Sequence, residues 1–202
     1  AAAQAEAGLQ RAIDAGLARL SSARQDDAAP RPERPREDPA DAWRRVDDTS
    51  IPARAKVTGI YVNNAMAKTE ANLNGFDEAI MLNRHGLVSE CTGENLFVVR
   101  NGRIITPPLS AGALEGITQA SVIKILEDLG YEVEKGNIAR SDLYIAEEIF
   151  CVGTAAEVSA INSVDDRKVP CPGPATKAVA EVYAKAVRNQ DPRYSAWCEL
   201  VG

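Results

Sequence analysis

The chain has 202 residues, of which 45% are hydrophobic and 26% charged, so it can bury one core and carry a short appendage. Its net charge of −6 excludes the basic surface that nucleic acids require, and no apolar run reaches the roughly 20 residues that cross a bilayer. The amino terminus also lacks a signal-like segment, so we expect a cytoplasmic protein that acts on small molecules or contacts other proteins.

Residues 1–41 are predicted to be an appendage to the domain. From Ser21 to Pro39, charged residues and proline replace large apolar side chains, which predicts a disordered linker. The cofactor-binding domain described below is expected over residues 42–202. A short amphipathic helix before the linker is indicated by four apolar residues on one helical face, Leu9, Ile13, Leu17 and Leu20.

The expected domain begins with a helix and antiparallel strands. The helix is predicted over Tyr61–Asn74, ending at Gly75, and a strand over Glu78–Leu82 follows. Asn101-Gly102 lies between two apolar segments and is a strong signal for a type I′ hairpin. The two hairpin strands are expected over Asn95–Arg100 and Arg103–Thr106. Five residues of the first helix are expected to face the core, namely Val62, Ala65, Met66, Thr69 and Leu73.

The second half continues as a mixed α and β domain. Its predicted elements, in order, are a helix over Gly116–Gly130, a strand at Tyr131–Val133, a short helix capped by Ser141, a buried strand at Ile149–Val152, a hairpin turning at Asp165-Asp166 and a helix over Pro174–Val187.

Lys56 is the candidate nucleophile among the seven lysines. It lies between the extended Ile51–Ala53 and a helix entry at Gly59, where burial would activate an amine. The other lysines suit solvated surfaces. A surface lysine in a connection is the commoner interpretation of Lys56 from local sequence alone.

Three loops carry further candidate groups. Glu90 and Glu94 flank a small turn in SECTGENLF at 89–97, and solvated loop acids are the common local interpretation. The helix start LEGIT at 114–118 and the strand end VGTAAEV at 152–158 offer backbone amides and hydroxyls that suit a phosphate or carboxylate. Taken singly, each of these two is more often a cap or turn.

No metal site is predicted from the cysteines. They are widely spaced, form no CxxC pair and have His85 as the one possible imidazole companion, so reduced thiols and no structural zinc are expected. The four are Cys91, Cys151, Cys171 and Cys198.

Seven segments together resemble the branched-chain aminotransferases of fold-type IV, the class IV pyridoxal-phosphate aminotransferase family, over residues 42–202. Several loops distant in sequence agree at once, in the family's order and spacing. The segments are RAKVTGIYVNNAMAKTEA at 54–71, SECTGENLF at 89–97, TPPLSAGALEGIT at 106–118, SDLYIAEEIF at 141–150, GTAAEV at 153–158, GPATK at 173–177 and DPRYSAW at 191–197.

The resemblance implies an α+β fold with a mixed, largely antiparallel sheet or pseudo-barrel and packed helices, like the family's large domain. It also implies that Lys56 binds pyridoxal 5′-phosphate covalently and later moves a proton between substrate and cofactor. By the same resemblance, Glu90 holds the pyridine nitrogen and Asn95 buttresses the Glu90 loop. The remaining implied contacts are Tyr61 to the cofactor ring oxygen, Ile117, Thr118 and Thr154 to its phosphate, and the amides of Thr154 and Ala155 to the substrate carboxylate.

The implied activity is transamination of leucine, isoleucine and valine with 2-oxoglutarate, in a homodimer or higher homo-oligomer. Two alternatives stay open: a D-amino-acid aminotransferase or aminodeoxychorismate lyase relative, and a non-catalytic cofactor-binding or dimerisation remnant. The second arises because the small domain that the family places upstream of Trp43, with an arginine for the cofactor phosphate, does not resemble residues 1–41. Two other departures from the family are Cys91, usually glycine, and Gln119, usually arginine.

Overall fold

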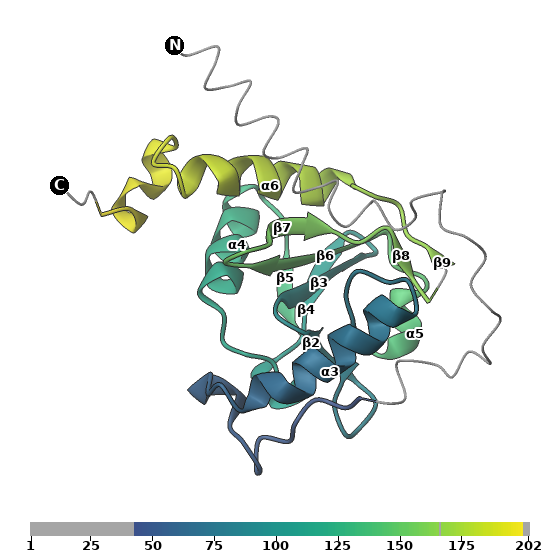
Figure 1. The fold of residues 1–202 in the computed structure, drawn as a ribbon. Coiled ribbons are helices and arrows are strands. Elements are labelled where there is room, and N and C mark those ends of the chain that lie inside the picture. The colour runs from purple at the N-terminus through teal and green to yellow at the C-terminus, as the bar shows by residue number, and fades with distance from the viewer. Residues whose placement is uncertain (1–42, 166, 200–202) are drawn as a thin grey trace.

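A computed structural model describes residues 43–165 and 167–199, and its centre is a five-stranded sheet with the order β5-β4-β3-β6-β7 (Figure 1). The helix and linker expected within residues 1–41, and Asp166 of the predicted hairpin, lie outside the described residues. The five strands are β3 (Asn95–Arg100), β4 (Arg103–Thr106), β5 (Val133–Lys135), β6 (Glu148–Gly153) and β7 (Glu157–Ala160).

The sheet is mixed and largely antiparallel, as expected. β3 pairs antiparallel with β4 and β6, β6 pairs antiparallel with β7, and β4 pairs parallel with β5. Asn101 and Gly102 connect β3 to β4 with φ angles of 52° and 72°, the pair of positive φ values that a type I′ turn requires. The hairpin prediction is therefore confirmed.

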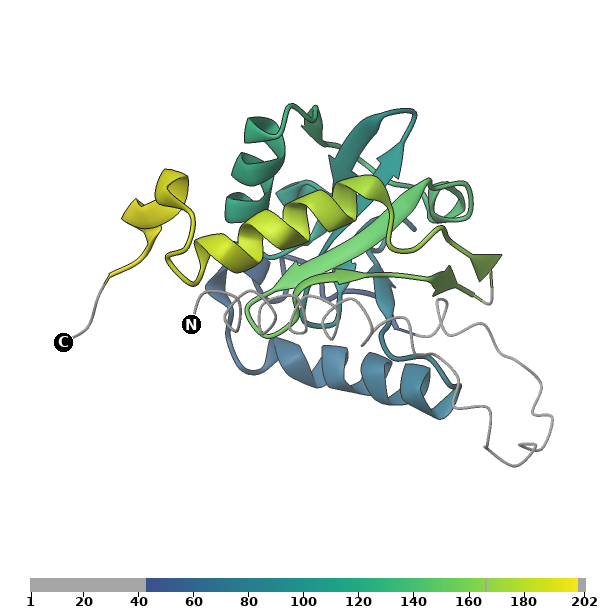
Figure 2. The ribbon, with the colours of Figure 1, turned by 90° about the horizontal axis from the view of Figure 1, so that it is seen from above.

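Alternate residues of the central strands bury two opposite faces of the sheet. Phe97 of β3 stacks on Phe150 of β6, with ring centroids 4.9 Å apart, in the core beneath α4 (Ile117–Asp128) and α6 (Pro174–Ala186). Leu96 and Ile149 belong to the second core, on the other face. Figure 2 shows α4 and α6 on one side of the sheet and α3 (Ile60–Leu73) on the other. This arrangement follows from the two-residue period of β-strands.

The position of α3 was predicted correctly, but its buried face was not. Val62 is 63% exposed and Met66 49% exposed, whereas Asn64 and Ala67 are buried. Thr69 and Ala65 are exposed as well, and so is Leu73. The prediction followed the larger apolar side chains, while the helix packs through small residues that allow close approach and through an asparagine with buried partners. The buried residues of α3 are Ile60, Asn64, Ala67 and Ala71.

The smaller elements differ in detail from the prediction. The predicted cap Ser141 lies inside a short helix, whose N-cap is Ala139, because the carboxylate of Asp142 accepts the Ala139 N–H at 2.9 Å. β7 was not predicted as a strand. The other elements are β1 (Ile80–Leu82), β2 (Val88–Cys91), α5 (Arg140–Leu143), β8 (Ser163–Val164), β9 (Arg167–Lys168) and the 3-10 helices η1 (Ala53–Ala55), η2 (Leu109–Ala111) and η3 (Pro192–Trp197).

A buried carboxylate anchors α6 to the sheet. Glu148 accepts the amide of Ala175 at 3.0 Å, and the amide and hydroxyl of Thr176 at 2.9 and 2.7 Å. Its negative charge also faces the positive end of the helix dipole. Glu148 therefore satisfies the first-turn donors of α6 that the helix itself leaves unpaired.

Replacing Glu148 by alanine is expected to lower the free energy of unfolding by about 2–3 kcal/mol, because buried donors lose a charged acceptor. Urea unfolding monitored by circular dichroism measures it. The neighbouring Glu147 is exposed and accepts the Asn101 amide at 2.8 Å, so Glu147→Ala is the matched control, with an expected loss of about 1 kcal/mol or less. Equal losses for the two variants would contradict the anchoring role.

Candidate functional site

Glu90 is a buried carboxylate, and both of its oxygens have polar partners. Oε1 lies 2.7 Å from Nη2 of Arg45, with the two side chains 6% and 3% exposed. Oε2 accepts the Leu114 amide at 2.8 Å and the Asn95 side-chain amide at 3.3 Å. Asn95 thus lies against this carboxylate, where a buttress of the Glu90 loop would be placed. The solvated loop acid that local sequence favoured is wrong for Glu90.

The groups around Glu90 have opposing effects on the pKa of its carboxyl. Burial raises the pKa of its carboxyl, while the charge of Arg45, the Leu114 amide and the charge of Lys56 act to lower it. Arg45 is the cation in closest contact, and sequence reasoning missed it. The available signal was weak, since an arginine two residues after Trp43 looks like any surface charge until the chain is folded.

Asn64 connects this ion pair to α3. Its Oδ1 accepts Nη1 of Arg45 at 2.8 Å, and its Nδ2 donates to the Thr92 carbonyl at 2.6 Å. Arg45 also donates to the Gly112 carbonyl at 3.2 Å. The guanidinium is therefore fixed by three separate segments, and a small cavity of about 20 Å³ beside it is lined by residues that include Tyr61 and Glu90.

Lys56 lies at the end of η1, before α3 begins. It is the C-cap residue in a left-handed conformation, with φ 47° and ψ 36°, which is uncommon for a residue other than glycine. Its Nζ lies 5.7 Å from the centroid of the Tyr61 ring. The side chain is exposed in this structure, so the expected burial of Lys56 is wrong here.

The two predicted anion-binding turns both contact the Glu90–Asn95 segment. A Cβ at Gly116, the N-cap of α4, would lie 2.1 Å from Oδ1 of Asn95. A Cβ at Gly153 would lie 3.2 Å from Cγ of Glu94. Both glycines therefore allow the turns to approach this segment closely.

The predicted phosphate and carboxylate contacts differ in their accessibility. Thr118 is buried in the first turn of α4, whereas the Ile117 side chain is 86% exposed, which leaves its backbone amide at the helix start as the possible donor. Thr154 and Ala155 are exposed at the tip between β6 and β7. The cavity beside Glu90 includes none of these four in its lining. The structure thus places the two turns next to the Glu90 segment and leaves them outside its cavity.

A second cavity, of about 100 Å³, lies away from this chemistry, with lining residues that include Phe76, Ile80 and Ile161. Its lining contains neither Glu90 nor Lys56.

Within the described part of the chain, no helix has the length and apolar character needed to cross a bilayer.

The arrangement combines a buried carboxylate, an accessible amine and two turns suited to anions. A carboxylate paired with Arg45 can stabilise a protonated ring nitrogen, and an amine can bond to an aldehyde. The residues present therefore fit a phosphorylated pyridine aldehyde by the chemistry of their donors and acceptors.

Comparison with known proteins agrees with this fit between the site and a phosphorylated pyridine aldehyde. The model of the family described as amino-transferase class IV matches residues 17–164 and so begins inside residues 1–41, the predicted appendage. A probable branched-chain-amino-acid aminotransferase of Aquifex aeolicus is 52% identical over 159 residues, which are 77% of this chain and 51% of that relative. The chain thus spans about half the length of the curated relatives it matches.

Solved structures share the fold. The branched-chain aminotransferase of Thermoproteus uzoniensis with norvaline has a TM-score of 0.75 and 48% identity, and the match covers 77% of this chain and 52% of that one. The T.th. branched-chain amino acid aminotransferase complexed with N-(5′-phosphopyridoxyl)-L-glutamate has a TM-score of 0.77 and 44% identity, covering 80% and 54%. With a family model that matches most of its length and a fold shared with these enzymes, the chain belongs to the class IV aminotransferase family.

Proposed function

We propose that this chain is the cofactor-bearing part of an enzyme that transfers amino groups between leucine, isoleucine or valine and 2-oxoglutarate with pyridoxal 5′-phosphate. The observation that carries the proposal is the buried Glu90 carboxylate, fixed by Arg45, Asn95 and the Leu114 amide. Names of relatives support the substrate class, and the phosphopyridoxyl-glutamate complex of a relative supports both the cofactor and a glutamate-derived partner.

In this proposal, each candidate residue has one task. When bound, the cofactor withdraws electrons from the α-carbon of the substrate through its protonated ring. Glu90 keeps that ring nitrogen protonated, and Tyr61 contacts the ring oxygen. Lys56 holds the cofactor covalently and moves a proton to and from the α-carbon. The phosphate is assigned to Ile117, Thr118 and Thr154, and the substrate carboxylate to the amides of Thr154 and Ala155.

The exposure of Lys56 is compatible with these tasks. An accessible Nζ next to the Tyr61 ring can reach an aldehyde that enters from solvent, and the left-handed backbone at Lys56 fixes where the side chain leaves the chain. Asn95 links Glu90 to the loop before α4, so the carboxylate and one proposed phosphate site are held by the same side chain.

The visible absorption spectrum of the purified protein with pyridoxal phosphate, before and after addition of valine, tests the proposal. A band of the lysine-bound cofactor that changes with valine is the expected result. No such band would favour the alternative of a non-catalytic remnant. A band that responds to D-amino acids and not to valine would favour a D-amino-acid aminotransferase relative.

The Glu90→Gln variant is expected to retain its fold and to lose roughly a hundredfold in the rate of the half-reaction with valine. A neutral amide cannot hold a proton on the pyridine nitrogen as a carboxylate does. Stopped-flow measurement of the cofactor band gives the rate. Asp77 is an exposed acid outside the site, so Asp77→Asn serves as the control and should react at the parental rate. Parental speed in Glu90→Gln would refute the role of Glu90.

We also propose that the protein forms a homodimer or higher homo-oligomer. Exposed apolar side chains on α3, represented by Val62 and Met66, support this, since a second copy of the chain could cover them. Light scattering over a range of concentrations tests it. A Val62→Lys/Met66→Lys variant is expected to shift the distribution towards monomer, and an unchanged mass would exclude this face.

A further inference from the structure

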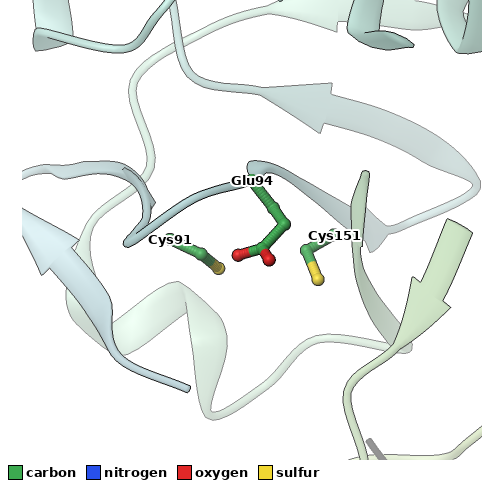
Figure 3. Close-up of side chains that lie close together, drawn as sticks. All are labelled: Cys91, Glu94 and Cys151. Carbon is green, nitrogen blue, oxygen red and sulfur yellow. The ribbon is translucent and has the colours of Figure 1, made fainter. Parts of the chain in front are cut away.

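Cys91, Glu94 and Cys151 are brought together by the fold although 60 residues separate the two cysteines in sequence. Cys91 ends β2, and its amide donates to the Glu94 carbonyl at 2.8 Å across a tight turn. Cys151 lies in β6, opposite Leu96 of the neighbouring β3. Figure 3 shows the Glu94 carboxylate between the two sulfur atoms.

The two sulfur atoms and a Glu94 carboxylate oxygen all lie within 4.8 Å of one another. A zinc ion bonds thiolate sulfur at about 2.3 Å and carboxylate oxygen at about 2.0–2.2 Å. Two thiolates on opposite sides of one such ion would stand about 4.6 Å apart, and tetrahedral geometry brings them to about 3.8 Å. Adjustments of about an ångström or less in side-chain position would therefore place all three ligands on one cation.

The charge around this cluster also favours a cation. Glu78 lies beside Glu94, and the structure places two carboxylates against buried thiols, with Lys68 bonded to Glu78 at 2.6 Å. One lysine thus faces two carboxylates, and this excess of acidic over basic groups suits a cation.

We propose that Cys91, Glu94 and Cys151 form a binding site for a thiophilic divalent cation of the Zn²⁺ class. Two soft sulfur ligands select zinc and cadmium over magnesium and calcium, which prefer oxygen ligands. Glu78 supports the site from outside. Its carboxylate is already bonded to Lys68 and to the amides of Ala79 and Thr92, so it orients the cluster without being a ligand.

Binding is an exchange of protons for a metal ion. Each thiol loses its S–H bond and forms a metal–sulfur bond, and two protons pass to solvent. The Glu94 carboxyl gives up any proton it holds and binds through one oxygen. No oxidation state changes. A water molecule can complete a tetrahedral shell.

Cadmium is the probe, because cadmium–thiolate bonds absorb in the ultraviolet. The reduced chain of 202 residues is titrated with micromolar Cd²⁺ without added cofactor or phosphate. One equivalent is expected to saturate the band, and Zn²⁺ should displace the cadmium. The measurement does not require aminotransferase activity, so its outcome is independent of the proposed function. Absence of the band, or no displacement by Zn²⁺, overturns the proposal and leaves the cluster as packed thiols.

Variants locate the site. Cys91→Gly and Cys151→Ser are each expected to abolish the one-equivalent band, because each removes one sulfur ligand. Cys171→Ser and Cys198→Ser, which alter the free cysteines outside the cluster, should leave it unchanged. Loss of the band in these controls and not in the first two variants refutes the site.

Glu94→Gln keeps both thiols and covers the case in which a cysteine variant fails to fold. It is expected to weaken cadmium binding by about tenfold or more, because the charged oxygen ligand is lost. Unchanged affinity would remove Glu94 from the site and contradict the three-ligand arrangement.

Discussion

Replacing Lys56 by alanine is expected to abolish covalent binding of pyridoxal phosphate and to reduce transamination by at least about a thousandfold. The variant loses both the amine that bonds to the cofactor and the group proposed to move the substrate proton. Because Lys56 is exposed, the free energy of unfolding should change by about 0.5 kcal/mol or less. A loss of function without a loss of stability separates a chemical role from a structural one.

Borohydride reduction of the cofactor-loaded protein, followed by peptide mapping, locates the bond. The label should appear on the peptide that contains Lys56 and be absent from the Lys56→Ala variant. Lys124→Ala is the matched control, since Lys124 is an exposed lysine of α4 paired with Asp128. It should keep full labelling. Label on Lys68 or Lys124 with none on Lys56 would end the assignment.

The sequence predicted the elements whose signals are local. The β3–β4 hairpin needs two residues with positive φ, and Asn101-Gly102 supplies them. The helix over Pro174–Ala186 starts with proline at its first turn, where the missing N–H costs nothing. The face of α3 could not be predicted in the same way. Its burial depends on what packs against it, and Asn64 is buried because Arg45 and Thr92 supply its partners.

The candidate site likewise contains residues with a local sequence signal and residues without one. Glu90 and Asn95 were found because they share one short segment whose pattern is informative, and the structure joins them to the loop before α4. Arg45 was missed because its partner is 45 residues away, in a strand that it reaches only in the folded chain. The wide spacing of Cys91 and Cys151 in sequence predicted no metal site, yet the fold brings their sulfur atoms within 4.8 Å of each other.

Breaking the Arg45–Glu90 ion pair is expected to have the largest effect on the free energy of unfolding. Arg45→Met keeps much of the side-chain volume but leaves the Glu90 carboxylate buried without its cation, and removal of one partner of a buried pair costs about 3–5 kcal/mol. Arg44→Met is the matched control. Arg44 is exposed and donates to the Asn83 carbonyl at 3.2 Å, so its replacement should cost about 1 kcal/mol or less.

The stability of the Arg45→Met variant is also expected to depend on pH. Burial already raises the pKa of Glu90 above its ordinary value, and loss of Arg45 removes the main opposing charge, so the pKa rises further. In the folded variant, Glu90 then holds a proton that the unfolded chain releases. Protonated Glu90 therefore contributes stability that is fully present below the pKa of Glu90 in the unfolded chain. That stability is lost as the pH rises through the higher pKa of Glu90 in the folded variant. Urea unfolding should show a larger defect for Arg45→Met at pH 8 than at pH 5.

A double variant distinguishes an unpaired charge from lost packing. Arg45→Met combined with Glu90→Gln removes the carboxylate that the single variant leaves uncompensated, and it should recover part of the lost stability. Full recovery is not expected, because Asn64 and the Gly112 carbonyl also lose hydrogen bonds from Arg45. The stability defect of the double variant should no longer depend on pH between 5 and 8, because the titrating carboxylate is gone. A double variant as unstable as Arg45→Met at both pH values would show that the guanidinium acts through packing and hydrogen bonds and not by holding the charge on Glu90.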